Sequence, residues 1–176
     1  MSHVFEIART GRARCRACRN VIPKGEWRLG QKVDNPYGEG EATFYFHPIC
    51  AAAKLPDVLL AALATAEEGM PGTQQYRRLA ELASVHRRLP RLGRIEVAPS
   101  GRARCRHCRK SIDKGSQRMA LEVVDNGMLD PWGYLHLGCV WEYAEGDVVP
   151  LLEARGDVLD DRMRAALSAG KPAQMD

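Results

Sequence analysis

The sequence predicts an α+β fold in which two small modules of β-sheet and helix are joined by a helical linker and followed by a C-terminal helix. Three observations predict this fold. Residues 11–28 and 101–118 repeat one another, the six cysteines divide into one set of three per copy, and apolar residues recur at helical spacing between and after the copies. With 176 residues, of which 45% are hydrophobic and 27% charged, the chain has the composition of a globular protein.

The first module is expected over residues 1–55 and the second over residues 95–145. Three short stretches of β-forming residues predict the strands of the first sheet: VFEIA, EWRLGQKV and ATFYF. The second module offers GRIEVA, SQRMALEVV and YLHL at matching places. Glycine and proline around residues 35–40 predict a loop in the first module, and Asp125-Asn126-Gly127 predicts a turn in the second.

The remaining segments are predicted to be helical. The linker between the modules is expected over residues 56–94. It is formed largely by two helices, predicted over 51–69 and 72–89 and separated at Met70-Pro71-Gly72. The C-terminal region, residues 146–176, contains a helix predicted over 148–170 with an interruption at Gly156. A module of about 45 residues buries little apolar surface, so these helices are expected to add core to each module.

The cysteines predict two metal sites. Each copy has Cys-x2-Cys and then, after 28 or 27 intervening residues, His-x2-Cys. Three thiolates and one imidazole fill the tetrahedron that zinc prefers and leave no position for a water molecule, so we expect two structural Zn²⁺ ions. The predicted ligands are Cys15, Cys18, His47 and Cys50 in the first module and Cys105, Cys108, His136 and Cys139 in the second.

Other uses of the cysteines fit the sequence less well. Sets of three cannot pair internally as disulfides, and small buried thiols would not repeat this spacing. A redox dithiol is typical of a strand–helix setting, whereas the flanks here are rich in arginine. His3, His86 and His107 lie outside the pattern and are not expected to bind metal.

Charge and hydropathy bear on location and partners. No apolar run approaches the roughly 20 residues of a membrane helix, and the N-terminal residues lack a signal-peptide core, so we expect an intracellular protein without a membrane partner. The expected compartment is the cytoplasm or nucleoid of a bacterium, which we favour, or the nucleus of a eukaryote. Residues 1–50, 51–95 and 96–139 carry net charges of +3, +3 and +2, whereas residues 140–176 carry −4.

The repeated motif resembles a known zinc finger. Gly-Arg-Ala-x-Cys-x2-Cys, then Ile-x-Lys-Gly-x2-Arg and a later His-x2-Cys, is similar to the zinc finger of poly(ADP-ribose) polymerases and type III DNA ligases. The resemblance occurs twice, over roughly residues 4–55 and 95–145, and extends beyond the ligands. No part of the chain resembles the catalytic domain of either enzyme. The resemblance therefore implies a module that senses DNA breaks, without the enzyme.

The resemblance also implies DNA-contacting residues, because such fingers bind nicks, gaps and ends. The arginine of Gly-Arg-Ala lies near backbone phosphates, and the arginine that ends the Lys-Gly-x2-Arg run is a further basic position. By position these are Arg12 and Arg102, and Arg28 and Arg118. Apolar side chains before the His-x2-Cys pair stack on the exposed base pair. The candidates are Pro36 and Tyr37 in the first module and Met128, Leu129 and Trp132 in the second, which we expect to stack better.

The leading hypothesis from the sequence is a non-enzymatic protein that binds DNA strand breaks as a repair accessory, with no small-molecule substrate. The alternative is an adaptor for a repair or transcription protein, which would dock on the acidic C-terminal helix. An enzyme is disfavoured because both predicted metal sites are closed and the sequence has no evident nucleophile–base set or phosphate-binding glycine loop.

Overall fold

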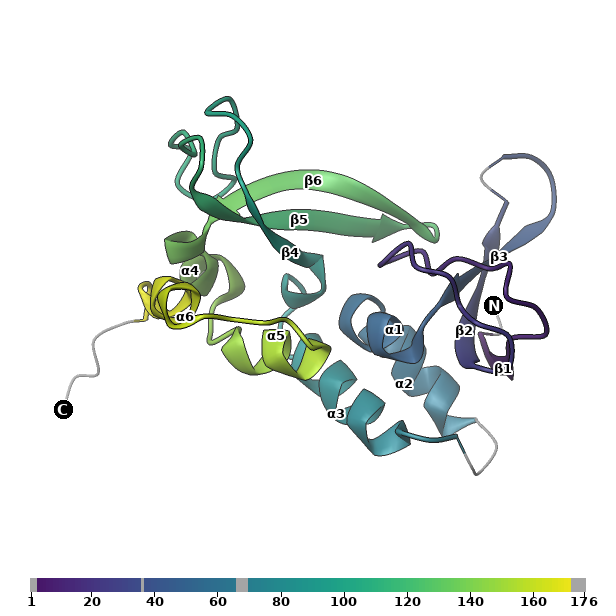
Figure 1. Cartoon of the computed structure of the whole chain (residues 1–176). Helices are drawn as coiled ribbons and strands as arrows, with labels where there is room; N and C mark the ends of the chain where they lie inside the picture. The colour runs from purple at the N-terminus through teal and green to yellow at the C-terminus, as the bar shows by residue number, and fades with distance from the viewer. Residues whose placement is uncertain (1–2, 36, 66–69, 172–176) are drawn as a thin grey trace. The chain divides into compact units, whose positions relative to one another are not determined.

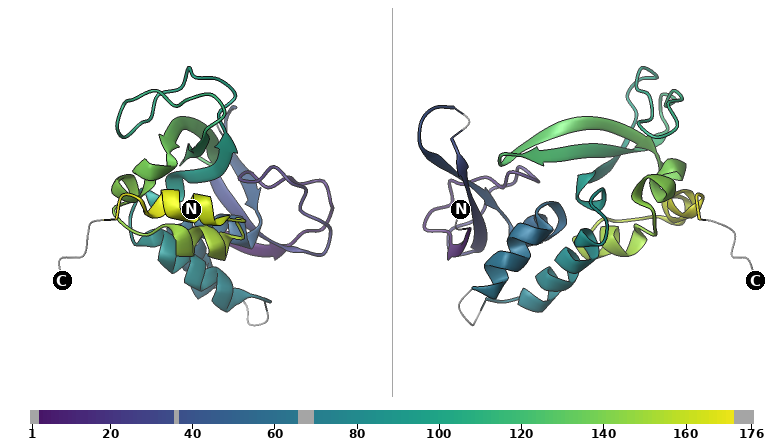
Figure 2. Two further views of the ribbon diagram at one scale, coloured as in Figure 1. Left: turned by 60° about the vertical axis from the view of Figure 1, so that its left-hand side comes forward. Right: turned by 180° about the vertical axis from the view of Figure 1, so that it is seen from behind.

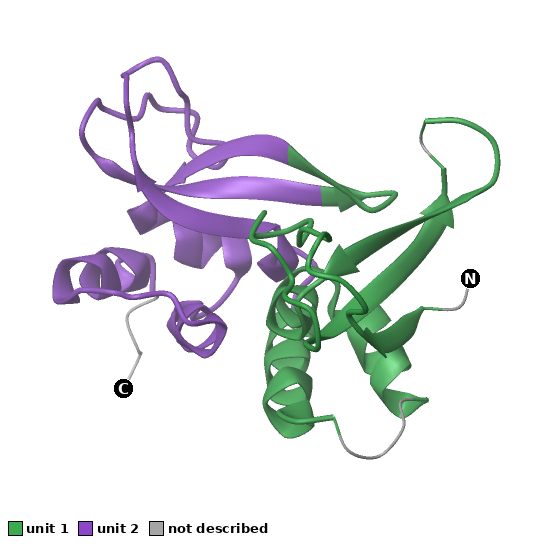
Figure 3. Cartoon of the chain, turned by 45° about the vertical axis from the view of Figure 1, so that its right-hand side comes forward, with its two compact units in different colours: residues 1–85, 124–130 green, residues 86–123, 131–176 purple. Residues whose placement is uncertain are grey.

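A computed structural model describes residues 3–35, 37–65 and 70–171 of the chain. The chain divides into two compact units (Figure 3): residues 1–85 with 124–130 form the first, and residues 86–123 with 131–176 form the second. Two three-stranded antiparallel sheets and several short helices make up these units, which confirms the predicted α+β class.

The first sheet has the order β1-β2-β3, with β2 in the centre (Figure 1). Its strands are β1 (Val4–Ile7), β2 (Trp27–Asp34) and β3 (Glu41–Phe46). Leu29 lies opposite Phe46 across β2 and β3, and both side chains are fully buried. Pairs of large apolar residues facing each other across strands stabilise such a sheet.

Three helices follow the first sheet: α1 (Pro48–Lys54), α2 (Pro56–Ala64) and α3 (Thr73–Ser84). The single helix predicted over 51–69 is thus two helices. The physical reason is Pro56, because a residue that precedes proline is pushed out of the helical region, and Leu55 has φ −134° and ψ 54°. Proline is well suited to the first position of a helix, where its missing N–H costs nothing.

These helices supply the core of the first unit. α3 packs on α1 and α2, while α1 contacts β2 and α2 contacts β1, as the views of Figures 1 and 2 show. Many of the buried residues are small, which lets the helices approach one another closely. The buried set includes Ala51, Ala52, Leu59, Leu79, Ala80 and Ala83.

The second sheet has the order β4-β5-β6. Its strands are β4 (Leu92–Val97), β5 (Gln117–Asp125) and β6 (Met128–His136). Between β5 and β6, Asn126 and Gly127 have φ of 43° and 73°. Two consecutive residues with positive φ form the tight turn that suits a twisted hairpin, so the predicted turn is confirmed.

Short helices flank the second sheet: η1 (Leu89–Arg91) precedes it, and η2 (Leu137–Cys139), α4 (Val140–Ala144), α5 (Val149–Arg155) and α6 (Asp161–Ser168) follow it. Helix α4 was not predicted. The interruption predicted at Gly156 is confirmed, because this residue ends α5 in the left-handed conformation with φ 94°. Asp160 then caps α6 by accepting a 2.7 Å hydrogen bond from the N–H of Met163.

Arg155 links α5 to the second sheet. Its guanidinium donates to the carbonyl oxygens of Leu92 and Gly93, each at 2.8 Å. The pairing of β4 with β5 shifts in register between Leu92 and Ile95, which interrupts the ladder at these carbonyls. Asp157 holds the arginine from the other side at 2.5 Å. Part of the acidic C-terminal segment is therefore an integral support of the second sheet.

Within the described ranges, every helix is too short or too polar to traverse a lipid bilayer.

Candidate zinc centres and nucleic-acid surface

The eight predicted ligands form two Cys3His clusters, one in each unit. In each cluster all four ligand atoms lie within 4.8 Å of one another. Zinc bound at about 2.3 Å to sulfur and about 2.1 Å to nitrogen places its tetrahedral donors roughly 3.5–3.8 Å apart. The clusters are Cys15, Cys18, His47 and Cys50, and Cys105, Cys108, His136 and Cys139. Each cluster therefore fits one structural Zn²⁺ ion, as predicted.

The Cys-x2-Cys segment forms a tight knuckle in both units. In the first unit the N–H of Cys15 donates to the carbonyl of Asn20 at 2.8 Å, and Arg19 donates back to the carbonyl of Cys15 at 2.9 Å. Arg19 has φ 67°, which turns the chain sharply after Cys18. The second unit repeats both bonds between the matching residues, at 2.9 and 3.0 Å. The two knuckles thus share the same backbone hydrogen bonds.

The ligand histidines are oriented by backbone carbonyls. His47 places Nδ1 3.3 Å from the sulfur of Cys18 and Nε2 3.3 Å from the carbonyl oxygen of Val21. For His136 the matching distances are 3.4 and 2.9 Å. A proton on Nε2 that is donated to a carbonyl leaves the Nδ1 lone pair for the metal, and such outer partners fix the ring of a ligand.

The thiols of each cluster differ in their pKa values. A hydrogen bond from the backbone of Lys110 lowers the pKa of Cys108 to about 6, whereas burial raises the pKa of Cys139 to about 12. In the first unit a hydrogen bond from Cys50 lowers the pKa of Cys15 to about 4, and the same bond raises the pKa of Cys50. Zinc must displace the protons that remain, so its affinity falls as the pH falls.

Arg28 is engaged inside the first unit. Its Nη2 lies 2.5 Å from Oε1 of Glu6 on β1, and its guanidinium carbon lies 3.6 Å from the ring centre of Tyr45 on β3. Only 8% of the residue is exposed. This glutamate–arginine–tyrosine clamp crosses all three strands of the sheet. Nε and Nη2 of Arg28 are therefore committed to a contact within the sheet, and its role toward DNA stays a prediction.

The second unit contains the same clamp. Arg118 lies 2.6 Å from Glu96 and 3.4 Å from the ring centre of Tyr134, and it is 5% exposed. The hydrogen bond from Arg118 lowers the pKa of Glu96, so the carboxylate stays charged well into the acid range. Arg118, like Arg28, therefore holds the three strands of its sheet together, and its role toward DNA stays a prediction.

Arg12 and Arg102 are placed differently. Both are exposed and lie in the turn that precedes the zinc knuckle of their unit. Neither forms an ion pair with any residue in the described ranges. Their guanidinium groups are free to bind an anion.

The predicted stacking residues occupy different settings. Tyr37 is 74% exposed in the loop between β2 and β3, where its N–H donates to the side chain of Asn35 at 3.0 Å. Pro36 lies outside the described residues. Met128 and Leu129 begin β6 directly after the hairpin turn, and Trp132 follows on the same strand with 36% exposure.

Two further residues emerge from the structure. The guanidinium of Arg16 lies 3.9 Å from the ring centre of Phe44, and that of Arg106 lies 5.0 Å from the ring centre of Trp132. The sequence carries a signal for them, because each directly follows the first ligand cysteine of its copy. His107, next to Arg106, pairs with Glu142 at 2.7 Å and not with the metal cluster.

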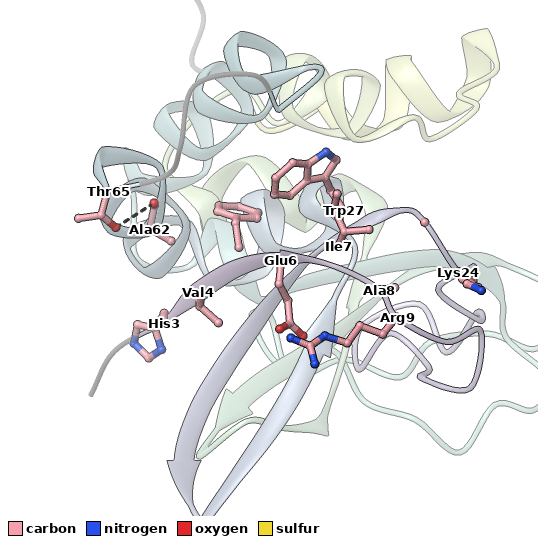
Figure 4. A pocket seen from close by; sticks show the side chains of 12 residues that line it. His3, Val4, Glu6, Ile7, Ala8, Arg9, Lys24, Trp27, Ala62 and Thr65 are labelled. Carbon is pink, nitrogen blue, oxygen red and sulfur yellow. Dashed lines mark hydrogen bonds between the residues drawn. The ribbon is translucent and has the colours of Figure 1, made fainter.

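A cavity of about 660 Å³ lies beside β1 in the first unit (Figure 4). Its lining combines apolar side chains with charged ones and includes Val4, Glu6, Ile7, Arg9, Lys24, Trp27 and Thr65. None of its lining residues is a zinc ligand. Glu6 belongs both to this cavity and to the clamp with Arg28.

Comparison with known proteins agrees with the geometry. Poly(ADP-ribose) polymerase 1 of Oryza sativa subsp. japonica is 26% identical over 150 aligned positions, which cover 82% of this chain and 15% of that protein. The polymerase of Drosophila melanogaster is 23% identical over 194 positions, covering 93% of this chain and 19% of that protein. Poly(ADP-ribose) polymerase 1 of Danio rerio is 27% identical over 153 positions, which cover 76% of this chain and 15% of that protein. No protein-family model matches the chain.

The chain thus spans less than a fifth of the length of these relatives. The resemblance to poly(ADP-ribose) polymerase zinc fingers is confirmed by these similarities together with the two Cys3His clusters.

Proposed function

We propose that this protein binds DNA at strand breaks through its two zinc units and serves as an accessory factor in DNA repair. The observation that carries the proposal is the doubled zinc knuckle with an exposed arginine at the same place before each one. The similarity to poly(ADP-ribose) polymerases supports it, because zinc fingers of that type bind nicks, gaps and ends. On this proposal the protein is not an enzyme.

Arg12 and Arg102 are the proposed phosphate contacts. A planar guanidinium with five N–H donors matches phosphate oxygens, and both side chains are exposed and without an acidic partner in the described ranges. Arg28 and Arg118 are weaker candidates, because Nε and Nη2 of each already donate to a glutamate of the same sheet.

Apolar side chains at the β5–β6 hairpin and in the β2–β3 loop are the proposed contacts to the base pair at the break. A break removes one stacking neighbour, so an apolar wedge can cover the exposed pair without opening an intact stack. Met128 and Leu129 stand at the start of β6, immediately after a tight turn, and Tyr37 stands in a longer loop. We propose that the β5–β6 hairpin contributes more, because the loop with Tyr37 also carries Glu39 and Glu41.

The test is a binding assay with three duplexes of equal length, one nicked, one with an exposed end and one closed and intact, at a fixed salt concentration. We expect tighter binding to the broken duplexes. Arg102→Gln should weaken binding to all three and reduce the salt dependence by about 0.9 in the log–log slope, the value for one phosphate contact on duplex DNA. Equal affinities for all three duplexes would contradict break recognition, and absence of binding would contradict the whole proposal.

The adaptor function is the second candidate, and the charge of residues 140–176, net −4, favours it. The structure determines how to test it. Leu151 and Leu152 of α5 are buried, so removal of the whole C-terminal region would damage the second unit. Substituting the exposed Asp161 of α6 by asparagine spares that core. Loss of a partner protein from this variant, with unchanged DNA binding, would favour the adaptor.

Both candidate functions, DNA binding and the adaptor role, imply an intracellular location, in the nucleoid of a bacterium or the nucleus of a eukaryote.

A further inference from the structure

Six arginines of the described residues lie on aromatic rings, and four of them, Arg16, Arg28, Arg106 and Arg118, differ in burial and in their partners. Arg28 and Arg118 are buried, and a carboxylate takes the donors at the edge of the guanidinium. Arg106 is exposed, lies 5.0 Å from the ring centre of Trp132, and has no acidic partner in the described ranges. The fourth, Arg16, lies on Phe44 and is half-buried.

The placement of Arg106 is specific. Its backbone N–H donates to the carbonyl of Tyr134 at 2.8 Å, and its Nε donates to the carbonyl of Trp132 at 2.8 Å. Gly133 makes room for it, because a Cβ at this residue would lie 2.8 Å from Nε of Arg106, and its φ of 117° is one that other residues rarely adopt. The side chain therefore packs against β6 through Nε, and its two terminal nitrogens do not take part in this hydrogen bond.

A second cation shares the same ring. Arg91, at the end of η1, also places its guanidinium carbon 5.0 Å from the ring centre of Trp132. We call Arg91, Arg106 and Trp132 the Trp132 cluster. Two like charges near one ring repel each other, so an anion between or beside them would be stabilised. Stacking uses the face of a guanidinium, and its N–H edge remains available for phosphate oxygens.

We propose that the Trp132 cluster is a second phosphate-binding site of the second unit, in addition to Arg102. Arg106 and Arg91 bind a backbone phosphate of DNA, and Trp132 is a positioning residue that holds them and does not itself stack on a base. This inference rests on the proposed DNA binding, but not on break recognition. It assigns Trp132 a role different from that of Leu129.

The experiment measures the affinity of the full zinc-loaded chain for intact and nicked duplexes of equal length over a series of salt concentrations. Arg106→Gln should weaken binding to both duplexes and reduce the log–log salt slope by about 0.9. Trp132→Leu should also reduce the salt slope. Trp132→Phe keeps an aromatic face and should retain most of the wild-type slope. The ratio of nicked to intact affinity should stay at the wild-type value in all three variants.

Arg162→Gln is the matched control, because it removes the same charge from an exposed position on α6 and should leave the slope unchanged. Zinc content and the melting temperature establish that each variant is folded. A wild-type slope for Arg106→Gln would overturn the proposal. So would a Trp132→Leu variant that keeps its slope but loses the preference for the nick, because that result would make Trp132 a stacking residue.

Failure of the proposed function has a different signature. If the wild-type protein binds nicked and intact duplexes equally, break recognition is wrong, and the slopes still decide the role of the Trp132 cluster. If the wild-type protein binds neither duplex, both proposals fall.

Discussion

The two zinc units are alike at the metal and different at the far end of their sheets. Near the metal the knuckle bonds, the carbonyl partner of the histidine and the clamp recur at matching residues. At the far end, β2 and β3 join through a loop that carries the exposed Tyr37, whereas β5 and β6 join through a turn of two residues.

The difference shows which parts of the repeat are constrained. Four donors within 4.8 Å of one another require fixed positions for the knuckle and for the end of the last strand. The strand ends farthest from the metal contribute no ligand, so their sequence can diverge without loss of zinc. Two copies of one zinc-binding frame can therefore carry different surfaces for a nucleic acid.

The largest effect is expected from removing a ligand. Cys105→Ser should abolish zinc binding in the second unit and unfold that unit, because apparent zinc binding energies of roughly 10–16 kcal/mol act as folding energy in such modules. Cys15→Ser should do the same to the first unit. Metal analysis is expected to give one zinc per chain for each variant and two for the wild type. Two zinc ions in either variant would show that the ligand assignment is wrong.

The clamps should differ in strength between the units. Arg118→Met should lower the free energy of unfolding of the second unit by about 2 kcal/mol, less than the roughly 3–5 kcal/mol for a fully buried pair, because Glu96 keeps 22% exposure. Arg28→Met should cost the first unit less, since Glu6 is 33% exposed. Denaturation of the zinc-loaded proteins measures both changes. An equal or larger loss for Arg28→Met would contradict this ranking.

The clamp of the second unit should also respond to pH. Because Arg118 lowers the pKa of Glu96, the clamp stabilises the folded state fully above the ordinary glutamate pKa, and this stability is lost as the pH falls through the lowered value. The difference in unfolding free energy between the wild type and Glu96→Gln should therefore be largest near neutral pH and shrink in acid. A difference that is constant with pH would show that the carboxylate charge does not matter.

The far ends of the sheets should differ in their contribution to DNA binding. Leu129→Ala should reduce the preference for nicked over intact duplex by about 1 kcal/mol, the lower end for a stacking side chain, and Tyr37→Ala should reduce it less. The measurement is the ratio of the two affinities at one salt concentration. If Tyr37→Ala has the larger effect, the loop between β2 and β3 provides the main wedge.

An effect of similar size concerns the supporting helices. Asp160→Ala should destabilise the second unit by about 1 kcal/mol, because it removes the side-chain cap of α6. Thermal unfolding of the second unit reports this loss, and Asp161→Ala, one residue later and exposed, serves as the control. Equal melting temperatures for Asp160→Ala and the wild type would mean that α6 contributes little to its unit.

Much of the fold and the metal chemistry could be predicted from the sequence. The doubled spacing of cysteine and histidine indicates both ligand sets, because tetrahedral coordination leaves few other uses for such a pattern. Gly156 and the Asp125-Asn126-Gly127 turn could be predicted because their conformations depend on local chain geometry. The break at Pro56 has the same local cause and was a signal available in the sequence.

The role of Arg28 could not be predicted in this way. Its position in the motif indicates a basic surface residue, and only the pairing of β1 with β2 brings Glu6 opposite to it from 22 residues away. The seat of Arg106 likewise depends on a strand 26 residues later. Such contacts follow from strand register, which a single sequence specifies only through the whole sheet. The boundaries predicted for the two modules, the linker and the C-terminal region, at residues 1–55, 56–94, 95–145 and 146–176, stay a prediction.

Each zinc cluster draws all four ligands from its own unit, and this has a consequence for the response of the protein to metal supply. Loss of one ion leaves the ligand set of the other unit intact. As free zinc declines, the protein is therefore expected to pass through a half-loaded form that keeps one set of the proposed DNA contacts. Scarcity of zinc would then weaken binding in two steps, one for each unit, and would not abolish it at once.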